Sequence, residues 1–469
     1  MNMRLRKKEK PLKRKIDLTE GSILKKLLIV AIPVLLTSFI QMTYNLTDMF
    51  WVGRVDFIGL DPIDAVAAVG TAGFYPWFGM GMIMIVKVGV SVYISQSAGR
   101  NDKEAVNRYA TNGLMLMLFI ALFYMIFGTF FNHIFVGFFD INNSTVENYA
   151  MDYLSIISMF GFALFTVNLF NGIYDGLGKT INTFYISATG LVLNMILDPV
   201  LILGFNMGVR GAAIATAASQ LFVLLVYLVI YSSNKRPATI SIKRYFSLET
   251  TKKIFTLGVP VGIQSMFMTT ISIVVGIIVA SYGASVMSIS RIGSQIEALS
   301  WMIASGFQVA LASFVGQNYG AYKIDRVKDG YIMSLKLLVP YGILVNTLLF
   351  VFAEPLFGIF IDEPTTLAGG AEYLRIISIS QLFMILELTT AGAFNGLGKT
   401  IFPSTVGMIG NALRIPFALM ASTAAGIWWT ISLSSVFKGT VLFIIFIYYL
   451  AKIVRRHKEA IMVEKIEAI

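Results

Sequence analysis

Long stretches without charged residues recur along the whole chain, and they constrain its fold more than any other feature. The first runs for 21 residues, from Leu27 to Thr47. As a helix it would cross most of the roughly 30 Å hydrocarbon core of a bilayer. Only 13% of the 469 residues are charged and the mean hydropathy is +0.75, whereas about a quarter of the residues of a soluble protein are charged. We therefore expect a polytopic all-α membrane protein.

Twelve membrane-spanning helices fit the apolar runs. Several exceed the roughly 20 residues that a span needs, which predicts tilting, kinking or extension beyond the bilayer. The expected ranges are 24–51, 62–98, 107–132, 145–176, 181–205, 209–232, 251–281, 284–319, 327–354, 366–396, 401–425 and 427–454.

The positions of the lysines and arginines predict the orientation in the membrane. With a cytoplasmic N-terminus, 29 of the 37 lie in inside segments and two, Arg54 and Arg210, lie outside. This is the positive-inside asymmetry of a protein of the plasma (inner) membrane with both termini cytoplasmic. The net charge of +11 is thereby explained without nucleic-acid binding.

The two halves of the chain repeat. NGIYDGLGKT at 171–180 matches AGAFNGLGKT at 391–400, and SQSAGRNDKEAV at 95–106 parallels GQNYGAYKIDRV at 316–327. Because each half has an even number of helices, the halves share one orientation and are parallel repeats. We predict two pseudo-symmetric six-helix lobes. The expected divisions are a basic cytoplasmic tail (1–22), the first lobe (23–232), a cytoplasmic linker (233–250), the second lobe (251–454) and a cytoplasmic tail (455–469).

Several common classes of site are excluded. Cysteine is absent and the two histidines are far apart, so neither thiolate nor multi-histidine metal sites can form. GLGKT resembles the end of a phosphate-binding loop, but the required earlier glycine is replaced by Ile173 and Ala393. We expect tight turns between helices at these glycines. No paired catalytic residues appear, so we expect neither an enzyme nor a bound cofactor.

Ionisable residues within spans are costly and usually face a cavity or a partner. Asn194 and Asp198 are four residues apart and share one helix face. If their helix meets that of Thr216 and the end of the first helix, where Asp48 lies, two carboxylates, an amide and a hydroxyl converge. Such a site suits a hard cation, including Na⁺, or a shared proton. The alternatives are that Asp48 reaches the membrane interface and that Asn194 and Asp198 have a structural role.

Together, these segments resemble the multidrug and toxic compound extrusion (MATE) family over essentially the whole chain. The resemblance rests on Pro33 with TDMFWVGR, the turns Gln96–Gly99 and Gln317–Gly320, LNMILDPVLILG, GVRGAAIAT and the two GLGKT turns. It implies two lobes arranged as a V around a central cavity and export of cationic amphipathic drugs in exchange for Na⁺ or H⁺. It further implies that Asp48, Asn194, Asp198 and Thr216 form the cation site of the first lobe and that Pro33 lets the first helix bend.

The second lobe departs from one branch of that family. Where NorM-type members carry acidic residues, an ungapped alignment places Met268 and Met384. Arg414 stands at the repeat position of Asn194, so the two lobes differ chemically. We expect a polar cavity in the second lobe formed by Glu297, Glu387 and Arg414.

The expected function is therefore a secondary antiporter, a monomer, that exports organic cations or amphipathic compounds against Na⁺ or H⁺ entry. One alternative is a flippase or exporter of a lipid-linked oligosaccharide; twelve helices and the acidic first lobe argue against it. The other is a channel or a membrane enzyme.

Overall fold

The computed structural model describes residues 17–58, 61–139, 141, 143–233, 236–361 and 363–467, and every regular element among them is helical. Helices are expected in lipid, where a segment must satisfy its own backbone hydrogen bonds. The first half contains α1 (Ile23–Val52), η1 (Val55–Ile58), α2 (Pro62–Ala72), α3 (Phe74–Gly99), α4 (Lys103–Phe130), α5 (Asn132–Gly137), α6 (Ser144–Met159), α7 (Gly161–Gly176), α8 (Thr180–Pro199), the π-helical turn η2 (Val200–Gly204) and α9 (Gly208–Ser232). The second half contains α10 (Ile242–Tyr245), α11 (Leu248–Ala280), α12 (Ala284–Gly320), α13 (Ile324–Val351), α14 (Ala353–Gly358), α15 (Pro364–Gly396), α16 (Ile401–Ala412), α17 (Arg414–Met420) and α18 (Ala424–Glu467).

The prediction of an all-α membrane protein is confirmed. Within the described residues, ten helical segments are long and apolar enough to cross a membrane, and α6 with α7 forms an eleventh that is bent by 50°. The remaining predicted range, 401–425, is occupied by the two shorter helices α16 and α17. The last helix also runs past the predicted end at 454 to Glu467, where the pair Arg455–Glu459 stabilises its exposed part with a 2.8 Å hydrogen bond.

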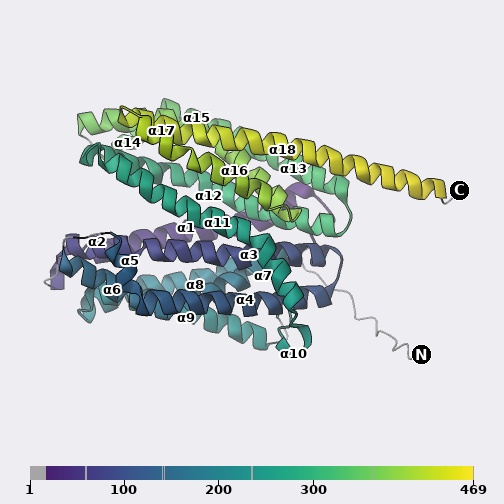
Figure 1. Cartoon of the computed structure of the whole chain (residues 1–469), viewed down its shortest axis with the longest axis horizontal. Helices are drawn as coiled ribbons and strands as arrows, with labels where there is room; N and C mark the ends of the chain where they lie inside the picture. The colour runs from purple at the N-terminus through teal and green to yellow at the C-terminus, as the bar shows by residue number, and fades with distance from the viewer. Residues whose placement is uncertain are drawn as a thin grey trace.

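The helices form two groups, α1–α9 and α11–α18 (Figure 1). The groups diverge toward the end where α2 and α14 lie and converge toward the end where both termini leave the molecule. Each group has its own apolar core, but Val30 of α1 packs into the core of the second group and Ile254 of α11 into that of the first. The beginnings of these two helices therefore join the groups.

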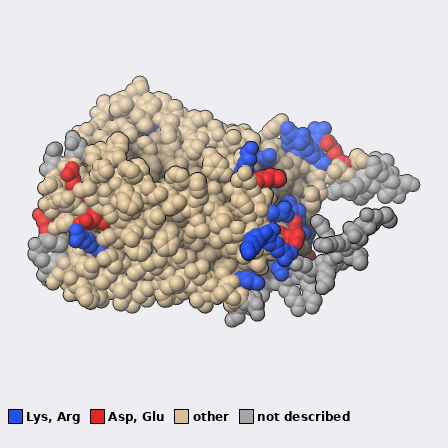
Figure 2. Space-filling model, turned by 60° about the horizontal axis from the view of Figure 1, so that its bottom comes forward, with Lys and Arg blue, Asp and Glu red and all other residues tan. Residues whose placement is uncertain are grey.

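Charged side chains are concentrated at the ends of the molecule. Figure 2 shows lysines and arginines gathered at the end where the termini lie, while the wide middle of this face carries few charges. Many large apolar side chains are exposed on the described part of the molecule, among them Phe123, Ile277 and Leu344. A broad apolar surface of this kind is suited to lipid.

The two motifs that repeat in the sequence bind each other across the groups. Gln96 Nε2 donates to the carbonyl of Gly396 at 3.0 Å, and Gln317 Nε2 donates to the carbonyl of Gly176 at 3.1 Å. We call these two reciprocal hydrogen bonds the glutamine clamp. Each acceptor belongs to a GLGKT turn, and the predicted tight turns are present: the third residues of the two motifs, Gly178 and Gly398, have φ of 69° and 73°.

Close backbone approach explains the glycines of the glutamine turns. A Cβ on Gly99 would lie 2.0 Å from the carbonyl oxygen of Gln317, and a Cβ on Gly320 would lie 2.0 Å from that of Gln96. Only glycine fits at these two positions. The same contact therefore occurs twice with the halves exchanged, as expected for two equivalent halves related by a pseudo-two-fold axis.

Candidate functional site

A cavity of about 1000 Å³ lies between the two groups of helices. Its walls combine apolar side chains, including Trp77, Trp301, Met80, Met268 and Met384, with polar ones from both halves. A volume of this size suits a drug-sized ligand, and thioether and aromatic walls adapt to ligands of different shape.

The first half contributes a buried cluster from three helices. Asn194 of α8 donates from Nδ2 to Asp198 Oδ1 at 3.2 Å and to Thr216 Oγ1 of α9 at 3.5 Å. Tyr44 Oη of α1 lies 2.7 Å from Thr216 Oγ1. Asn194 and Asp198 are 1% and 0% exposed. The structure thus brings together three of the four residues selected from the sequence and adds Tyr44.

Tyr44 was missed, although the sequence contains a signal. It lies four residues before Asp48 and therefore on the same face of α1. Asp48 belongs to the α1 backbone, but its side chain lies outside the described part of the structure.

The local backbone at Asp198 changes from α- to π-helix. Pro199 follows directly and closes α8, and the π-helical turn η2 begins at Val200. Proline lacks the amide hydrogen that would continue the α-helical pattern, and π-turns frequently occur at functional sites. The carboxylate of Asp198 therefore lies among buried oxygen-bearing groups, at the point where the backbone changes from α- to π-helix.

The chemistry of this cluster is compatible with a hard cation. Asn194 Oδ1 is buried and makes no hydrogen bond to a described residue. With the carboxylate of Asp198 and the hydroxyl of Thr216, it provides the oxygen ligands that such ions prefer. The described residues include no group of three or more His, Asp or Glu, so amide and hydroxyl oxygens would have to supply part of a cation shell.

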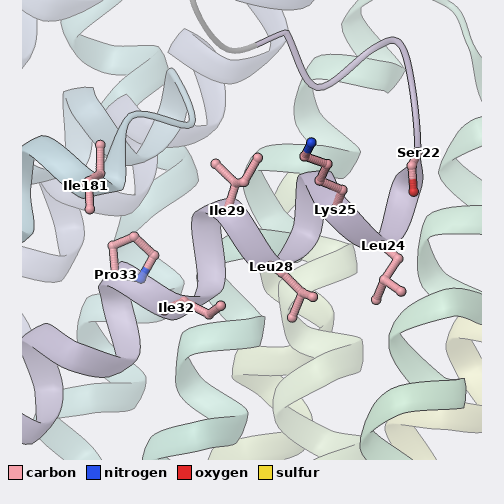
Figure 3. Close-up of a pocket in the computed structure, with 8 residues that line it drawn as sticks. All are labelled: Ser22, Leu24, Lys25, Leu28, Ile29, Ile32, Pro33 and Ile181. Atoms are coloured by element: carbon pink, nitrogen blue, oxygen red, sulfur yellow. The ribbon is translucent and has the colours of Figure 1, made fainter.

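Pro33 lies within α1, which remains helical on both sides of it. The Thr37 hydroxyl donates to the Pro33 carbonyl at 2.8 Å. A second pocket, of about 550 Å³, lies beside this part of α1 and reaches Ile181 of α8 (Figure 3). Its lining is mainly aliphatic, with Leu24, Leu28 and Ile32 on the α1 side. The structure thus places an open, mainly aliphatic surface pocket beside Pro33.

The second half contributes a different cluster to the same cavity. Glu297, Glu387 and Arg414, selected from the sequence, all line it together with Lys438. Lys438 Nζ lies 3.1 Å from Glu387 Oε2, and these side chains are 8% and 13% exposed. Gln381 Nε2 donates to Glu297 Oε1 at 3.2 Å. This wall thus contains two carboxylate side chains, Glu297 and Glu387, and two cationic ones, Arg414 and Lys438. Lys438, which is not among the residues selected from the sequence, is thus paired with a carboxylate inside the molecule.

A further ion pair in the first half escaped the sequence interpretation. Lys87 Nζ of α3 lies 3.8 Å from Asp175 Oδ2 of α7, and both residues line the cavity. The carbonyl of Asp175 also accepts a hydrogen bond from Ser313 Oγ of the second half. Asp175 precedes a turn motif, and its partner lies 88 positions earlier, so no local pattern indicates the pair.

Comparison with known proteins places the chain among transporters. The family model MatE matches residues 33–200 and 260–420. The "Probable multidrug resistance protein NorM" of Thermotoga maritima is 27% identical over 410 residues, which cover 84% of this chain and 85% of that protein.

Two solved structures show the same fold. One, described as the outward-facing conformation of a multidrug resistance MATE family transporter of the MOP superfamily, has a TM-score of 0.86 at 21% identity and covers 95% of this chain and 100% of its own. The other, described as MATE in complex with MaL6, has a TM-score of 0.84 at 22% identity and covers 94% and 99%. Because their sequence identity to this chain is low, these two structures show only that the fold is shared. The family match extends through both halves of the chain and includes Pro33, Asn194 and Asp198. The chain is therefore a multi-pass membrane transporter of the MATE family and not an enzyme.

Proposed function

We propose that this protein is a secondary antiporter that exports cationic or amphipathic organic compounds in exchange for Na⁺ or H⁺. The observation that carries the proposal is the contact of Asn194 with both Asp198 and Thr216 in the wall of the central cavity. A buried carboxylate beside amide and hydroxyl oxygens is a chemical basis for binding a small cation. The similarity to a protein named for multidrug resistance supports the drug-like substrate class.

We propose Asp48 as the fourth group of this site. It follows Tyr44 by one helical turn, and Tyr44 already contacts Thr216. Without a bound cation, the carboxylates of Asp48 and Asp198 would repel each other in a poorly solvated site. A proton or Na⁺ removes that repulsion.

The proposed coupling is competition between the ion and the exported compound. Cation binding draws the end of α1 toward α8 and α9, with Pro33 as the point of bending. This movement reduces the space or the negative charge that retains a cationic substrate. The ion can shift the balance between two arrangements because it binds one of them more tightly.

The proposed orientation has both termini in the cytoplasm and the protein, as a monomer, in the plasma (inner) membrane. It follows from the lysines and arginines at the end where the helix groups converge. In this orientation the glutamine clamp closes the cytoplasmic side, and the groups diverge toward the outside. The proposed divisions remain a first lobe at 23–232 and a second at 251–454.

A lipid-linked oligosaccharide is a less suitable substrate. Its pyrophosphate would favour a cavity with an excess of positive charge. The second-half cluster instead contains two acids and two bases, and the Lys87–Asp175 pair in the first half is balanced as well. In the first half, Asp198 adds a negative charge next to Asn194, which lines the cavity.

The proposal is tested with purified protein in liposomes loaded with a fluorescent organic cation. The dye flux is measured under a sodium gradient at fixed pH and under a pH gradient at equal sodium. Wild-type protein should move the dye under at least one gradient, and Asp198→Asn should abolish this flux. Asp152→Asn is the matched control, because Asp152 pairs with Arg210 at the surface of the same half. Gradient-driven flux by Asp198→Asn at the wild-type rate would refute the assigned site, and absence of flux in the wild type under both gradients would refute antiport.

A further inference from the structure

The threonine that ends each GLGKT turn binds a helix with a proline in its interior. Thr180 Oγ1, at the start of α8, donates to the Val30 carbonyl of α1 at 2.9 Å. In the second half, Thr400 Oγ1 donates to the Leu257 carbonyl of α11 at 2.6 Å. The two threonines are 0% and 3% exposed. The same buried hydrogen bond therefore occurs at equivalent places in both halves.

These hydrogen bonds lie where a proline disturbs the helix. Each accepting carbonyl precedes the proline of its helix, Pro33 or Pro260, by three residues. An interior proline interrupts the backbone hydrogen bonds of its helix, and threonine hydroxyls help to satisfy the freed groups in membrane helices. Ile181, the residue after Thr180, lines the same pocket as Ile29 and Pro33 (Figure 3). The start of α8 thus lies against the proline turn of α1.

The threonine bond and the cation-site cluster are equally far apart on the two helices. Val30 and Tyr44 of α1 are 14 residues apart, and so are Thr180 and Asn194 of α8. This separation is about 21 Å along each helix. Tyr44 and Asn194 both contact Thr216, so α1 and α8 are connected at two places in matching register. A shift of α1 by one residue would move Tyr44 by about 1.5 Å and rotate it by about 100° about the helix axis.

The two segments of α1 are held differently. Before the proline, Leu27 and Val30 are fully buried in the core of the second half, and Val30 is also bound by Thr180 of the first half. After the proline, Phe39 is 56% exposed. The first segment is therefore held from both halves, and a bend at Pro33 would move the second one.

We propose that Thr180 is a positioning residue for the cation site. Its hydroxyl fixes the segment of α1 before Pro33 against α8, the helix that carries Asn194 and Asp198. The movement that a cation causes is then confined to the segment after Pro33, and the register of that segment against Asp198 is set by Thr180. Thr400 holds α11 in the same way. This inference rests on the proposed export function and adds the residue that sets the register of α1.

Four variants separate positioning from a general loss of stability. Thr180→Val removes the hydroxyl and keeps the branched shape, and Thr180→Ser retains the donor. Thr189→Val is the control for a lost hydroxyl on α8, because Thr189 Oγ1 donates within its own helix, to the Ile186 carbonyl at 2.7 Å. Thr400→Val is the control for a lost bond between helices, because it removes the equivalent bond from the second half.

The first measurement reports the position of α1 and needs neither an ion nor a transported compound. Because the chain has no cysteine, spin labels are attached through Phe39→Cys on α1 and Phe119→Cys on α4, two residues that are more than half exposed. Pulsed EPR gives the distribution of distances between the labels in the full-length protein. Thr180→Val should displace or broaden this distribution, while Thr180→Ser and both controls should match the wild type. An unchanged distribution in Thr180→Val would overturn the inference.

The second measurement reports the cation site. Binding of rhodamine 6G, a fluorescent organic cation, is followed by anisotropy during titration with sodium at fixed pH and with acid at fixed sodium. Thr180→Val should need about fivefold more of the coupling ion to displace half of the dye, the scale of one hydrogen bond, and Thr180→Ser should recover most of this shift. Thr400→Val should lower the melting temperature as much as Thr180→Val but keep the wild-type midpoint. Equal midpoint shifts in Thr180→Val and Thr400→Val would indicate a general loss of stability and overturn the positioning role.

The two measurements also distinguish this inference from the export function. If dye binding to the wild type responds to neither ion, the proposed coupling is wrong, and the EPR comparison alone decides whether Thr180 sets the register of α1. If the wild type responds and Thr180→Val displaces α1 without moving the ion midpoint, the positioning of the cation site is overturned. Thr180→Ala is judged by the same criteria if Thr180→Val is not obtained as folded protein.

Discussion

Removing the glutamine clamp should open the end of the molecule where the two helix groups meet. In the variant Gln96→Ala/Gln317→Ala, both reciprocal hydrogen bonds to Gly396 and Gly176 are lost. Each such bond contributes about 1 kcal/mol net. Because both bonds cross between the groups, their loss should destabilise the closed arrangement relative to the open one by about 2 kcal/mol in total, which corresponds to about a 30-fold shift in population.

The absence of cysteine from the chain provides a direct assay. Ala312 lines the cavity on the part of α12 that leads to Gln317, so Ala312→Cys reports access to the floor of the cavity. A membrane-impermeant maleimide is applied to inverted vesicles, from the side where the termini are proposed to lie. Labelling should be slow when the clamp is intact and up to about 30-fold faster in the double variant.

Gln220→Ala is the matched control, since Gln220 lines the cavity from the first half and is not part of the clamp. The reasoning would be refuted if the double variant, folded and inserted in the membrane, were labelled no faster than Gln220→Ala. Faster labelling in each single variant by about one half of the free-energy change would show that the two equivalent bonds contribute equally and independently.

Three further predictions follow from other parts of the structure. Lys438→Met should lower the free energy of unfolding by about 3–5 kcal/mol, because it leaves the buried Glu387 without its partner; Lys438→Met/Glu387→Gln should be less damaging in the same thermal unfolding measurement. A cysteine introduced at Ile240 should react with an impermeant reagent in inverted vesicles and not in intact cells; labelling in intact cells would contradict the proposed topology. Hydrogen bonds from Thr365 and Thr366 lower the pKa of Glu363, the N-cap of α15, from 4.5 to about 2. Its capping contribution is complete above the unfolded pKa and is lost as pH falls through the folded one, so the difference in melting temperature between wild type and Glu363→Ala should shrink as the pH is lowered toward 2, and a constant difference would contradict this assignment.

The sequence predicts the helices well because the length of an uncharged apolar run is enough to indicate a membrane-spanning helix. Its errors occur where helices break or extend: Gly73 separates α2 from α3 within one predicted span, Leu413 separates α16 from α17, and α18 continues beyond 454. These irregularities depend on local packing and on exposed ion pairs, which a run of apolar residues does not reveal.

The candidate site was predictable where helical spacing brings residues together. Asn194 and Asp198, one turn apart, are in contact as their spacing indicates. Their approach to Thr216 required that two helices meet, which the sequence could only suggest. Partners that come from distant segments, such as Glu387 with Lys438, were not predicted because no local pattern relates positions on different helices.

The repeated turns illustrate the same limit. Their glycines predicted tight turns, and the positive φ of Gly178 and Gly398 confirms this. No sequence pattern indicates that the carbonyls of these motifs accept hydrogen bonds from Gln96 and Gln317 of the opposite half. Such contacts depend on how the halves are placed relative to each other, which comes only from the three-dimensional structure.

The central claim, that one site in the first half couples an ion to the exported compound, is tested most directly by ligand binding. The affinity of a fluorescent organic cation is measured in wild type and in Asp198→Asn across a range of sodium concentrations and of pH, with Asp152→Asn as control. We expect added sodium or acidification to weaken dye binding in the wild type and in the control, and Asp198→Asn to flatten that dependence. A wild-type affinity that is insensitive to both ions across the working range would contradict coupling by competition, even if the protein exports drugs.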